Sequence, residues 1–333
     1  MNGIAVLGAG SWGTALAIHL ARSGRPVRLW ARDSGLVERI GRTGINAVYL
    51  PGVALPPAIT LEASLARAVA GAAFVVLAVP SHGLRQVMRD AAAHLGPTAV
   101  IVSAAKGIEA GSLHRMSQVV LDETGGLLPI VALSGPSFAS EVARGLPAAV
   151  LAASTDAVAA ARVQDQFRGP GLRLYVSDDV AGVEIGGALK NVIAIAAGAV
   201  EGLGLGHNAM AALITRGLAE ISRLACAEGG RRDTLSGLSG LGDLVLTCTG
   251  DLSRNRHVGI ELGRGRALAA VLNELHMVAE GVRTTAAALE LGARHGIELP
   301  ITAQMAAVLA GRSSPREAVE SLMGRPQRAE LEA

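Results

Sequence analysis

A glycine-rich turn near the N-terminus constrains the fold more than any other feature of the chain. The motif Gly8-Ala9-Gly10-Ser11-Trp12-Gly13 follows a short apolar run, Ile4–Leu7, and opens a helical stretch, Thr14–Ser23. In this setting the first glycine permits a tight turn, the second lets the backbone approach a pyrophosphate, and the third allows close packing of helix on strand. The turn therefore predicts a dinucleotide site, with the pyrophosphate on N–H groups at the helix N-terminus.

The first half of the chain alternates short apolar runs with helical stretches. The predicted strands are Ile4–Leu7, Val27–Trp30, Phe74–Val79, Ala99–Ser103, Ile130–Leu133, Ala148–Ala153 and Arg173–Val176. Several lack polar alternation, as parallel strands covered on both faces do. This pattern predicts an α/β Rossmann domain with a doubly wound, mainly parallel sheet.

The character of the chain changes near residue 178. From Val183 onward there is hardly a β-branched run, and Ala-rich stretches repeat with helical spacing. A length of 333 residues suits two domains. We therefore expect a dinucleotide-binding domain over 1–178, an all-α domain over 179–325 and a polar tail over 326–333.

Composition excludes several classes of function. A net charge of +2 and an aromatic content of 2% argue against binding to duplex or single-stranded nucleic acid. The longest apolar runs, Ala72–Val79 and Val192–Val200, are shorter than the ~20 residues that span a bilayer, and no signal peptide fits before the glycine-rich turn. The cysteines, Cys226 and Cys248, lack zinc or disulfide-framework spacing. We expect a cytoplasmic protein with reduced thiols and no metal.

Lysine is rare in this chain, and both lysines fall in unusual segments. Lys106 and Lys190 are the only lysines among 30 basic residues; unlike arginine, lysine can lose its proton when desolvated. Lys106 follows a predicted strand, where ligands of open α/β sheets bind, and Lys190 lies in the Ala-rich segment Gly186–Asn191. A third polar segment, Ser134–Ala139, leaves another strand. Each alone has an ordinary alternative, such as a turn, a cap or a snorkelling lysine; together they predict a ligand site.

The second strand bears on the choice of nicotinamide cofactor. NAD-binding chains usually place an acidic residue at its end, to hold the ribose 2′-OH. Here Ala31 takes that place, and the adjacent Arg32 suits a 2′-phosphate, so the sequence favours NADP. A shift of two residues would make Asp33 the ribose ligand, so NAD stays open.

Taken together, these segments resemble the bacterial NAD(P)-dependent glycerol-3-phosphate dehydrogenases over nearly the whole chain. The matching motifs are Gly8–Ala15, Ala105–Ile108, Leu133–Ala139, Ala188–Val192, Leu238–Leu244, Thr247–Thr249, Ser253–Arg256 and Val278–Gly281. The resemblance implies an N-terminal Rossmann domain and a helical domain of the 6-phosphogluconate-dehydrogenase type. It also implies reversible reduction of dihydroxyacetone phosphate to sn-glycerol 3-phosphate, the backbone precursor of phospholipids.

The resemblance also assigns roles to individual residues. Lys190 becomes the proton donor in carbonyl reduction and the acceptor in reverse, since a tuned ammonium can release its proton. Lys106 supports the same oxygen, and Asp243 holds Lys190 or a substrate hydroxyl; the alternative for Asp243 is a helix N-cap. Glu280 is expected to bond the nicotinamide carboxamide or a ribose, with an exposed helix glutamate as its alternative.

The complete set of expected ligand contacts falls into two groups. The substrate side consists of Lys106, Gly135, Ser137, Lys190, Asn191, Asp243, Ser253, Arg254 and Asn255. The cofactor side consists of Gly8, Gly10, Ser11, Trp12, Gly13, Arg32, Lys106, Ala139, Arg254, Val278 and Glu280. His207 is expected to be a hinge or loop residue, and whether Tyr49 contacts the cofactor stays open.

Two other functions remain as alternatives. One is a β-hydroxy-acid dehydrogenase of the same architecture, which would need a grip for a carboxylate. The other is a non-catalytic NADP-binding sensor, which would not need both lysines and Asp243. A homodimer is expected from the apolar helical domain, with a small molecule as the substrate.

Overall fold

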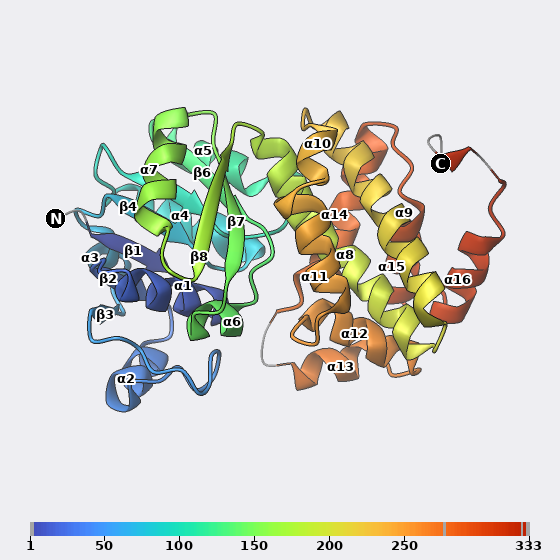
Figure 1. Ribbon diagram of the computed structural model, residues 1–333, viewed down its shortest axis with the longest axis horizontal. Helices are drawn as coiled ribbons and strands as arrows, with labels where there is room; N and C mark the ends of the chain where they lie inside the picture. Colours follow the sequence, from blue (N-terminus) through green and yellow to red (C-terminus); the bar gives the residue numbers. More distant parts are fainter. Residues whose placement is uncertain (1–2, 276–277, 328, 331–333) are drawn as a thin grey trace.

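The computed structural model describes residues 3–275, 278–327, 329 and 330, and Figure 1 shows a sheet-containing half beside a helical half. The elements of the first half are β1 (Ile4–Leu7), α1 (Ser11–Arg22), β2 (Val27–Trp30), α2 (Ser34–Thr43), β3 (Ile59–Glu62), α3 (Leu65–Val69), β4 (Phe74–Leu77), α4 (Ser81–Ala92), β5 (Val100–Ser103), α5 (Met116–Thr124), β6 (Ile130–Ser134), α6 (Ala139–Arg144), β7 (Ala148–Ala153), α7 (Ala157–Phe167) and β8 (Leu172–Ser177).

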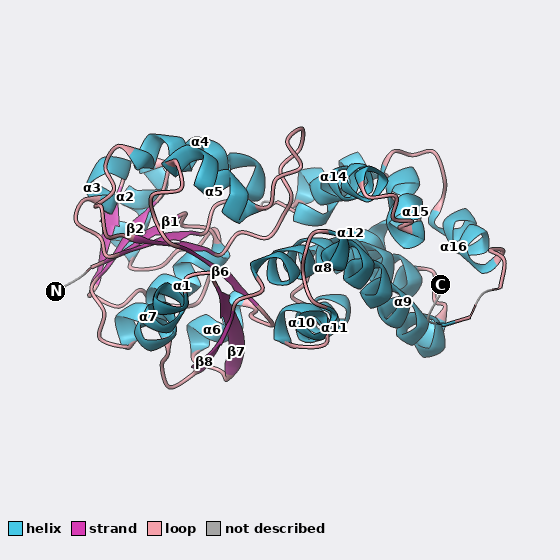
Figure 2. Cartoon of the chain, turned by 90° about the horizontal axis from the view of Figure 1, so that it is seen from above, coloured by secondary structure: helices cyan, strands magenta, loops and turns pink. Residues whose placement is uncertain are grey.

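These strands form one sheet in the order β3-β2-β1-β4-β5-β6-β7-β8. Neighbouring strands are parallel except at β6–β7, which is antiparallel, so the predicted doubly wound, mainly parallel sheet is confirmed. Alternate residues supply two separate cores: Leu7 and Val75 pack with α3, α4 and α5, whereas Val6 and Val76 pack with α1, α2 and α7. Figure 2 shows α4 and α5 on one side of the sheet and α1 and α7 on the other.

One strand, β3, is absent from the sequence-based prediction. Its four residues, Ile59–Glu62, pair with β2 at the edge of the sheet, and none of them is buried. An edge strand this short carries too little apolar signal to distinguish it from a loop. The motif helix also begins earlier than predicted, at Ser11 instead of Thr14, because Gly10 already serves as its N-cap.

The second half consists of helices in the described residues. They are α8 (Val180–Gly202), α9 (Gly206–Ala227), α10 (Arg232–Leu235), the π-helix η1 (Leu238–Gly242), α11 (Asp243–Thr249), α12 (Arg254–Gly263), α13 (Leu268–Glu274), α14 (Glu280–Arg294), α15 (Pro300–Leu309) and α16 (Pro315–Met323). The predicted helical second domain is therefore confirmed.

Helix α8 is the centre of this domain. Its length and apolar composition would suit a membrane span, but 89% of its most apolar window is buried inside the protein, which identifies it as a core helix. Helix α12 packs so closely on it that a Cβ at Gly259 would lie 1.9 Å from the Ile195 carbonyl oxygen. Strand β8 ends at Ser177 and Asp179 caps α8. We retain the division at residue 178 and the tail, which lies partly outside the described residues, as proposals.

The loop between β5 and α5 joins the two halves. We call residues 104–115 the Lys106 loop. Its apolar side chains Ile108 and Leu113 are buried in the core of the helical domain. Just beyond them, Arg115 Nη1 donates to the buried Glu184 carboxylate of α8 at 2.9 Å, and the Ser117 backbone N–H donates to it at 2.7 Å. The loop is thus anchored in the domain opposite to its own.

Candidate active site

A buried carboxylate bridges the two lysines of the chain. Asp243 Oδ1 accepts from Lys190 Nζ at 2.5 Å, and its Oδ2 accepts from Lys106 Nζ at 2.7 Å. The Asp243 side chain is 1% exposed, against 10% for Lys190 and 17% for Lys106. Lys106 Nζ also donates to the Gly135 carbonyl oxygen at 3.2 Å. Two cations and one anion therefore share a small, nearly closed space.

Three different elements bring these groups together. Lys190 lies on α8, Lys106 on the Lys106 loop at the carboxyl end of β5, and Asp243 is the first residue of α11. Small residues allow the approach: a Cβ at Gly187 would lie 2.8 Å from Ser134 Oγ and 3.6 Å from Lys106 Cγ. The π-helix that ends at Gly242 precedes Asp243, and single π turns of this kind are frequent at functional sites. Gly242, not Asp243, is the N-cap of α11.

The electrostatics of the trio shift the pKa values of Lys190 and Asp243. Burial lowers the pKa of Lys190 to about 8, with Asp243 opposing the shift and Lys106 adding to it. Burial alone would raise the pKa of Asp243, but the two ammonium groups outweigh it and hold that pKa below its ordinary value. Asp243 is thus an anion at neutral pH, beside an ammonium that can lose its proton.

Thr247 is a fourth member of this cluster, and the sequence-based assignment missed it. Its hydroxyl accepts from Lys190 Nζ at 2.9 Å and donates to the Asp243 carbonyl oxygen at 2.6 Å. It lies four residues after Asp243 on α11, a spacing that puts two side chains on the same helix face. Cys248, next in the chain, is buried, which raises the pKa of its thiol to about 12.

The expected phosphate-side residues gather at the start of α12. Ser253 caps this helix by accepting from the Arg256 backbone N–H at 3.2 Å. Arg254 is an exposed residue, but many protein atoms surround its guanidinium. The resulting desolvation lowers the pKa of Arg254, while the Glu280 carboxylate opposes this shift. Arg254 makes no ion pair among the described residues, so its guanidinium remains available to an anion.

Asn191 and Asn255 hold three helices at fixed distances. Asn255 Nδ2 donates to Asn191 Oδ1 at 2.9 Å, and Asn255 Oδ1 accepts from the Gly281 backbone N–H at 3.0 Å. These contacts tie α8, α12 and α14 together beside Lys190. An amide offers further donors and lone pairs, so both side chains can also meet a ligand.

Glu280 spans the two halves of the molecule. Its carboxylate accepts from the Ser81 backbone N–H at 3.0 Å and from Ser81 Oγ at 2.6 Å, at the first residue of α4. Gly107 packs against the same place, because a Cβ there would lie 2.6 Å from Ser81 Oγ. If Glu280 binds a nicotinamide or ribose as expected, its carboxylate does so while it also accepts from Ser81. The sequence-based assignment missed Ser81.

The glycine-rich turn forms a cradle that fits a dinucleotide. A Cβ at Gly8 would lie 2.7 Å from the Ala78 carbonyl oxygen, and one at Gly13 would lie 1.9 Å from the Gly8 carbonyl oxygen, whereas the space beside Gly10 is open. The first turn of α1 has no acidic residue and no capping side chain, so its N-terminus suits a pyrophosphate. Trp12 Nε1 is buried without a hydrogen-bond partner among the described residues.

The segment around Tyr49 closes one side of this cradle. Ser11 Oγ donates to the Tyr49 carbonyl oxygen at 2.6 Å. Asn46, which is fully buried, donates through Nδ2 to the Ala9 carbonyl oxygen at 2.8 Å and to Thr14 Oγ1 at 2.9 Å. The sequence-based assignment missed Asn46, and no motif marks it.

Arg32 and Asp33 differ in their surroundings. Asp33 Oδ2 pairs with Arg39 of α2 at 3.2 Å. Arg32 is exposed just after β2. Its positive charge contributes to the shifted pKa of His82, which lies at the start of α4. Burial and the nearby Arg283 lower the pKa of His82, Glu280 opposes this, and Arg32 adds to the lowering. The positive charge of Arg32 is thus near enough to the start of α4 to affect His82.

The other expected contacts lie at the ends of elements. Gly135 follows β6, Ser137 Oγ donates to the Gly135 carbonyl oxygen at 2.9 Å, and Ala139 is the first residue of α6. Val278 is partly buried two residues before α14. The expected loop position of His207 is wrong: the turn with positive φ ends at Gly206, and His207 is exposed in the first turn of α9.

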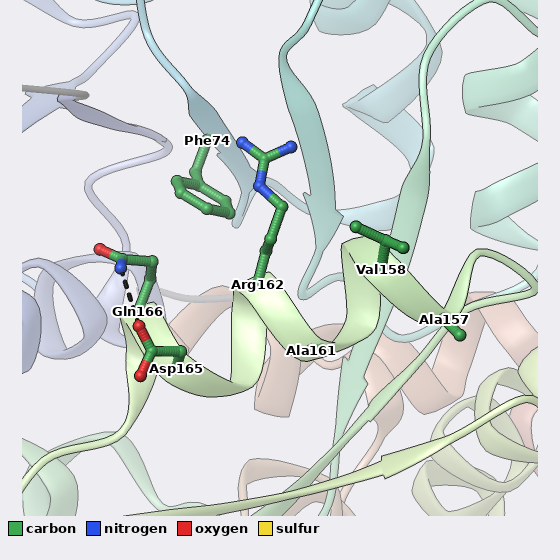
Figure 3. Close-up of a pocket in the computed structure, with 7 residues that line it drawn as sticks. All are labelled: Phe74, Ala157, Val158, Ala161, Arg162, Asp165 and Gln166. Atoms are coloured by element: carbon green, nitrogen blue, oxygen red, sulfur yellow. Dashed lines mark hydrogen bonds between the residues drawn. The ribbon is translucent and has the colours of Figure 1, made fainter.

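One surface hollow, of about 740 Å³, lies away from these groups. Figure 3 shows it along one face of α7, where Arg162 covers the ring of Phe74. Phe74 opens β4, at the sheet edge opposite to the carboxyl ends where ligands of α/β sheets bind. Among the residues that line the hollow there is no cluster of buried, mutually bonded titratable groups like that of Lys190, Asp243 and Lys106. No cluster of three metal-ligating side chains occurs in the described ranges.

Comparison with known proteins relates both halves to one family. The model for the NAD-dependent glycerol-3-phosphate dehydrogenase N-terminus matches residues 3–160, and that for the C-terminus matches residues 179–320. The chain is 53% identical to a glycerol-3-phosphate dehydrogenase [NAD(P)+] of Acidobacterium capsulatum, covering 99% of this chain and 100% of the relative. It is also 53% identical to one of Geobacter sulfurreducens, over 98% of each. The crystal structure of glycerol-3-phosphate dehydrogenase from Coxiella burnetii superposes with a TM-score of 0.94 at 40% identity, covering 97% of this chain and 99% of that one.

Proposed function

This chain belongs to the NAD-dependent glycerol-3-phosphate dehydrogenase family, and we propose that Lys190, Lys106 and Asp243 are its catalytic groups. The protein is an NAD(P)-dependent oxidoreductase that interconverts dihydroxyacetone phosphate and sn-glycerol 3-phosphate. The β-hydroxy-acid dehydrogenase and the non-catalytic sensor are the weaker alternatives, since near-full-length relatives share this activity.

The Lys190–Asp243–Lys106 trio carries the mechanistic proposal. In the reductive direction the bound cofactor supplies a hydride to the carbonyl carbon of the substrate. Negative charge then develops on the carbonyl oxygen, and Lys190 Nζ donates its proton to that oxygen. Its pKa of about 8 places this transfer near neutral pH. In the oxidative direction neutral Lys190 accepts the hydroxyl proton.

The neighbours of Lys190 prepare it for this step. Asp243 and Thr247 each hold its Nζ, at 2.5 and 2.9 Å, and so aim it. Lys106 adds a second positive charge beside the developing alkoxide, in surroundings from which water is largely excluded, where such charges act most strongly. Because Asp243 stays ionised, it balances one of the two cations without removing the donor's proton.

The start of α12 provides the grip for the phosphate. Arg254 offers a planar guanidinium, a geometry that suits a phosphate dianion. Ser253 and Asn255 add neutral hydrogen-bonding groups on either side of it. This combination fits a phosphotriose better than it fits a hydroxy acid.

The cofactor would lie between the glycine cradle and α14. Gly8, Gly10 and Gly13 shape the pyrophosphate site, with Ser11 and Trp12 beside it. Arg32 would meet the 2′-phosphate, and this favours NADPH over NADH. Ala139, Val278 and Glu280 would border the nicotinamide end.

The remaining expectations concern the molecule in the cell. We propose that the enzyme works in the cytoplasm and supplies sn-glycerol 3-phosphate for glycerophospholipid synthesis. The two cysteines, both free in the described residues, are consistent with that compartment. A homodimer would cover the apolar side chains that the helical domain leaves exposed around α11, namely Leu241, Val245 and Leu252. Sedimentation velocity of the purified protein tests this, and a monomer at all concentrations would contradict it.

The decisive experiment is an initial-rate assay with dihydroxyacetone phosphate, run in parallel with NADPH and NADH. We expect turnover with both and preference for NADPH. Arg32→Ala should raise KM for NADPH about tenfold or more, the range of one hydrogen bond to a charged group, and leave KM for NADH nearly unchanged. Preference for NADH would leave the proposed reaction unchanged and would make Asp33, not Arg32, the residue that recognises the ribose 2′-position. Absence of turnover in folded protein that binds NADPH would refute the substrate assignment.

A further inference from the structure

The Lys106 loop makes contacts with both domains. Lys106 reaches Asp243 in the helical domain, and Ile108 and Leu113 are buried in that domain's core. The loop is also held to its own domain: the Ala104 N–H donates to the Leu77 carbonyl oxygen at 2.9 Å, and Lys106 Nζ donates to the Gly135 carbonyl oxygen at 3.2 Å. The contacts that tie it to its own domain therefore decide where Lys106 lies relative to the cofactor.

Helix α4 makes further contacts with the Lys106 loop, all from one face of the helix. Ser81 and Arg85 are four residues apart, so both side chains lie on the same face. Gly107, the residue after Lys106, packs against Ser81. One turn further along α4, Arg85 binds Glu109 in the bidentate manner, Nε to Oε1 at 2.8 Å and Nη2 to Oε2 at 2.7 Å.

The Arg85 contact is more than a surface ion pair. Arg85 Nη1 also donates to Glu123 at 2.7 Å, and its Nη2 donates to Asp122 at 2.9 Å, both on α5. Its side chain is 26% exposed and that of Glu109 18%. Isolated exposed pairs stabilise little, but a bidentate, partly buried arginine within a network fixes geometry.

Glu109 transmits this hold to the rest of the loop. Its Oε2 accepts from Ser112 Oγ at 2.6 Å. Its backbone N–H donates to the His114 carbonyl oxygen at 2.9 Å, and its own carbonyl accepts from the Leu113 N–H at 3.0 Å. Fixing the Glu109 carboxylate thus fixes the turn that follows Lys106.

We propose that Arg85 is a positioning residue for the reaction: through Glu109 it holds the Lys106 loop where Lys106 Nζ meets Asp243. Arg85 does not touch the reacting atoms. The proposal rests on the proposed function only in its kinetic consequences, because a displacement of about 1 Å in a catalytic group can cost up to about 10²-fold in rate.

The test compares Arg85→Met with Arg89→Met. Arg89 lies one turn further along α4 and binds Glu123 at 2.9 and 3.0 Å, but no contact with the Lys106 loop is present among the described residues. Arg85→Met should lower kcat for reduction about tenfold and leave the Kd for NADPH within about twofold. Arg89→Met should stay within about twofold of the unchanged protein in both. Glu109→Gln should resemble Arg85→Met, and the double variant should be no worse than either, since the two residues act as one pair.

A pH profile separates positioning from simple loss of stability. Lys190 faces Asp243 and Cys248 of α11 and Lys106 of the loop. Burial lowers the pKa of Lys190 most, and the charge of Lys106 lowers it further. Withdrawal of Lys106 should therefore move the alkaline limb of kcat to higher pH in Arg85→Met. The proposal would be overturned if kcat of Arg85→Met fell while its alkaline limb stayed at the same pH. It would also be overturned if Arg85→Met and Arg89→Met gave the same kcat and the same pH profile.

Hydrogen exchange gives a readout that needs no turnover. Amides of residues 104–115 should exchange faster in Arg85→Met than in Arg89→Met, with those of α8 unchanged. Equal protection in the two variants would overturn the proposal. Inactivity of the unchanged protein with dihydroxyacetone phosphate would instead refute the proposed function, while the exchange comparison would still decide the role of Arg85.

Discussion

At the scale of single residues, the proposed chemistry depends most on Lys190. Lys190→Ala removes the proton donor and should lower turnover about 10²–10⁴-fold, the usual contribution of general acid catalysis, while NADPH still binds. Lys190→Arg keeps the charge but cannot release a proton near neutral pH, so it should not restore turnover. Steady-state rates combined with NADPH titration measure both, and unchanged turnover in Lys190→Ala would remove Lys190 from the mechanism.

The titration of Lys190 predicts opposite pH profiles for the two directions. Reduction needs protonated Lys190, so its kcat should be level below pH 8 and fall above it; oxidation needs neutral Lys190, so its kcat should rise through the same range. Asp243 raises the pKa of Lys190, so Asp243→Asn should move the reductive limb to lower pH. Parallel limbs in the two directions would show that another group titrates.

Residues that lie within motifs were accessible from the sequence, and their long-range partners were not. Lys106 and Asp243 lie in motifs at element ends, and Lys190 lies in a motif in the middle of α8. Thr247 could have been added from its spacing to Asp243. By contrast, Ser81 and Glu280 are 199 positions apart, and Arg85 and Glu109 are 24 apart. Serine, arginine and glutamate at such positions resemble ordinary surface residues until the fold brings them together.

At the scale of elements, the contact between α5 and α8 holds the helix that carries Lys190. Glu184 is 5% exposed, and its carboxylate accepts from Arg115 at 2.9 Å and from Ser117 Oγ at 2.5 Å. Glu184→Gln leaves the Arg115 charge partly unpaired in a buried place, so we expect a loss of about 3 kcal/mol in the free energy of unfolding. Urea denaturation of the protein measures this loss.

A second carboxylate at the same arginine provides the control. Glu228 lies 3.6 Å from Arg115 Nε, a longer contact than that of Glu184. Glu228→Gln should therefore cost about 1 kcal/mol or less. Equal losses in the two variants would mean that Glu184 has no special part in docking α8 against α5.

Element order was predictable because apolar runs and glycine breaks mark it directly. Strand β3 was not, since this four-residue edge strand is only partly buried and is defined by its pairing with β2. The π-helix before Asp243 was equally hidden. Within it Gly240 packs against the preceding turn, where a Cβ would lie 2.0 Å from the Leu235 carbonyl oxygen, and no periodicity rule anticipates such a contact.

At the scale of the whole molecule, several polar contacts join the two domains, and three of them lie on different elements. They are Lys106–Asp243, Ser81–Glu280 and Arg115–Glu184. Because apolar side chains of the Lys106 loop also enter the helical core, separation of the domains would expose apolar surface as well as break these contacts. We therefore expect the two domains to unfold in one cooperative transition.

Cofactor binding should then stabilise the entire protein and not only the sheet domain. NADPH at 100 times its Kd adds about 2.7 kcal/mol, which for a chain of this length corresponds to a rise of about 4 °C in Tm. Differential scanning calorimetry should show one transition that shifts as a unit. Lys190→Ala should shift equally, because Lys190 is assigned to the substrate. At the same NADPH concentration Arg32→Ala should shift less than the unchanged protein, since its Kd for NADPH is higher. Two transitions, of which only one responds to NADPH, would show that the interdomain contacts are too weak to couple the domains and that the cofactor is held by the sheet domain alone.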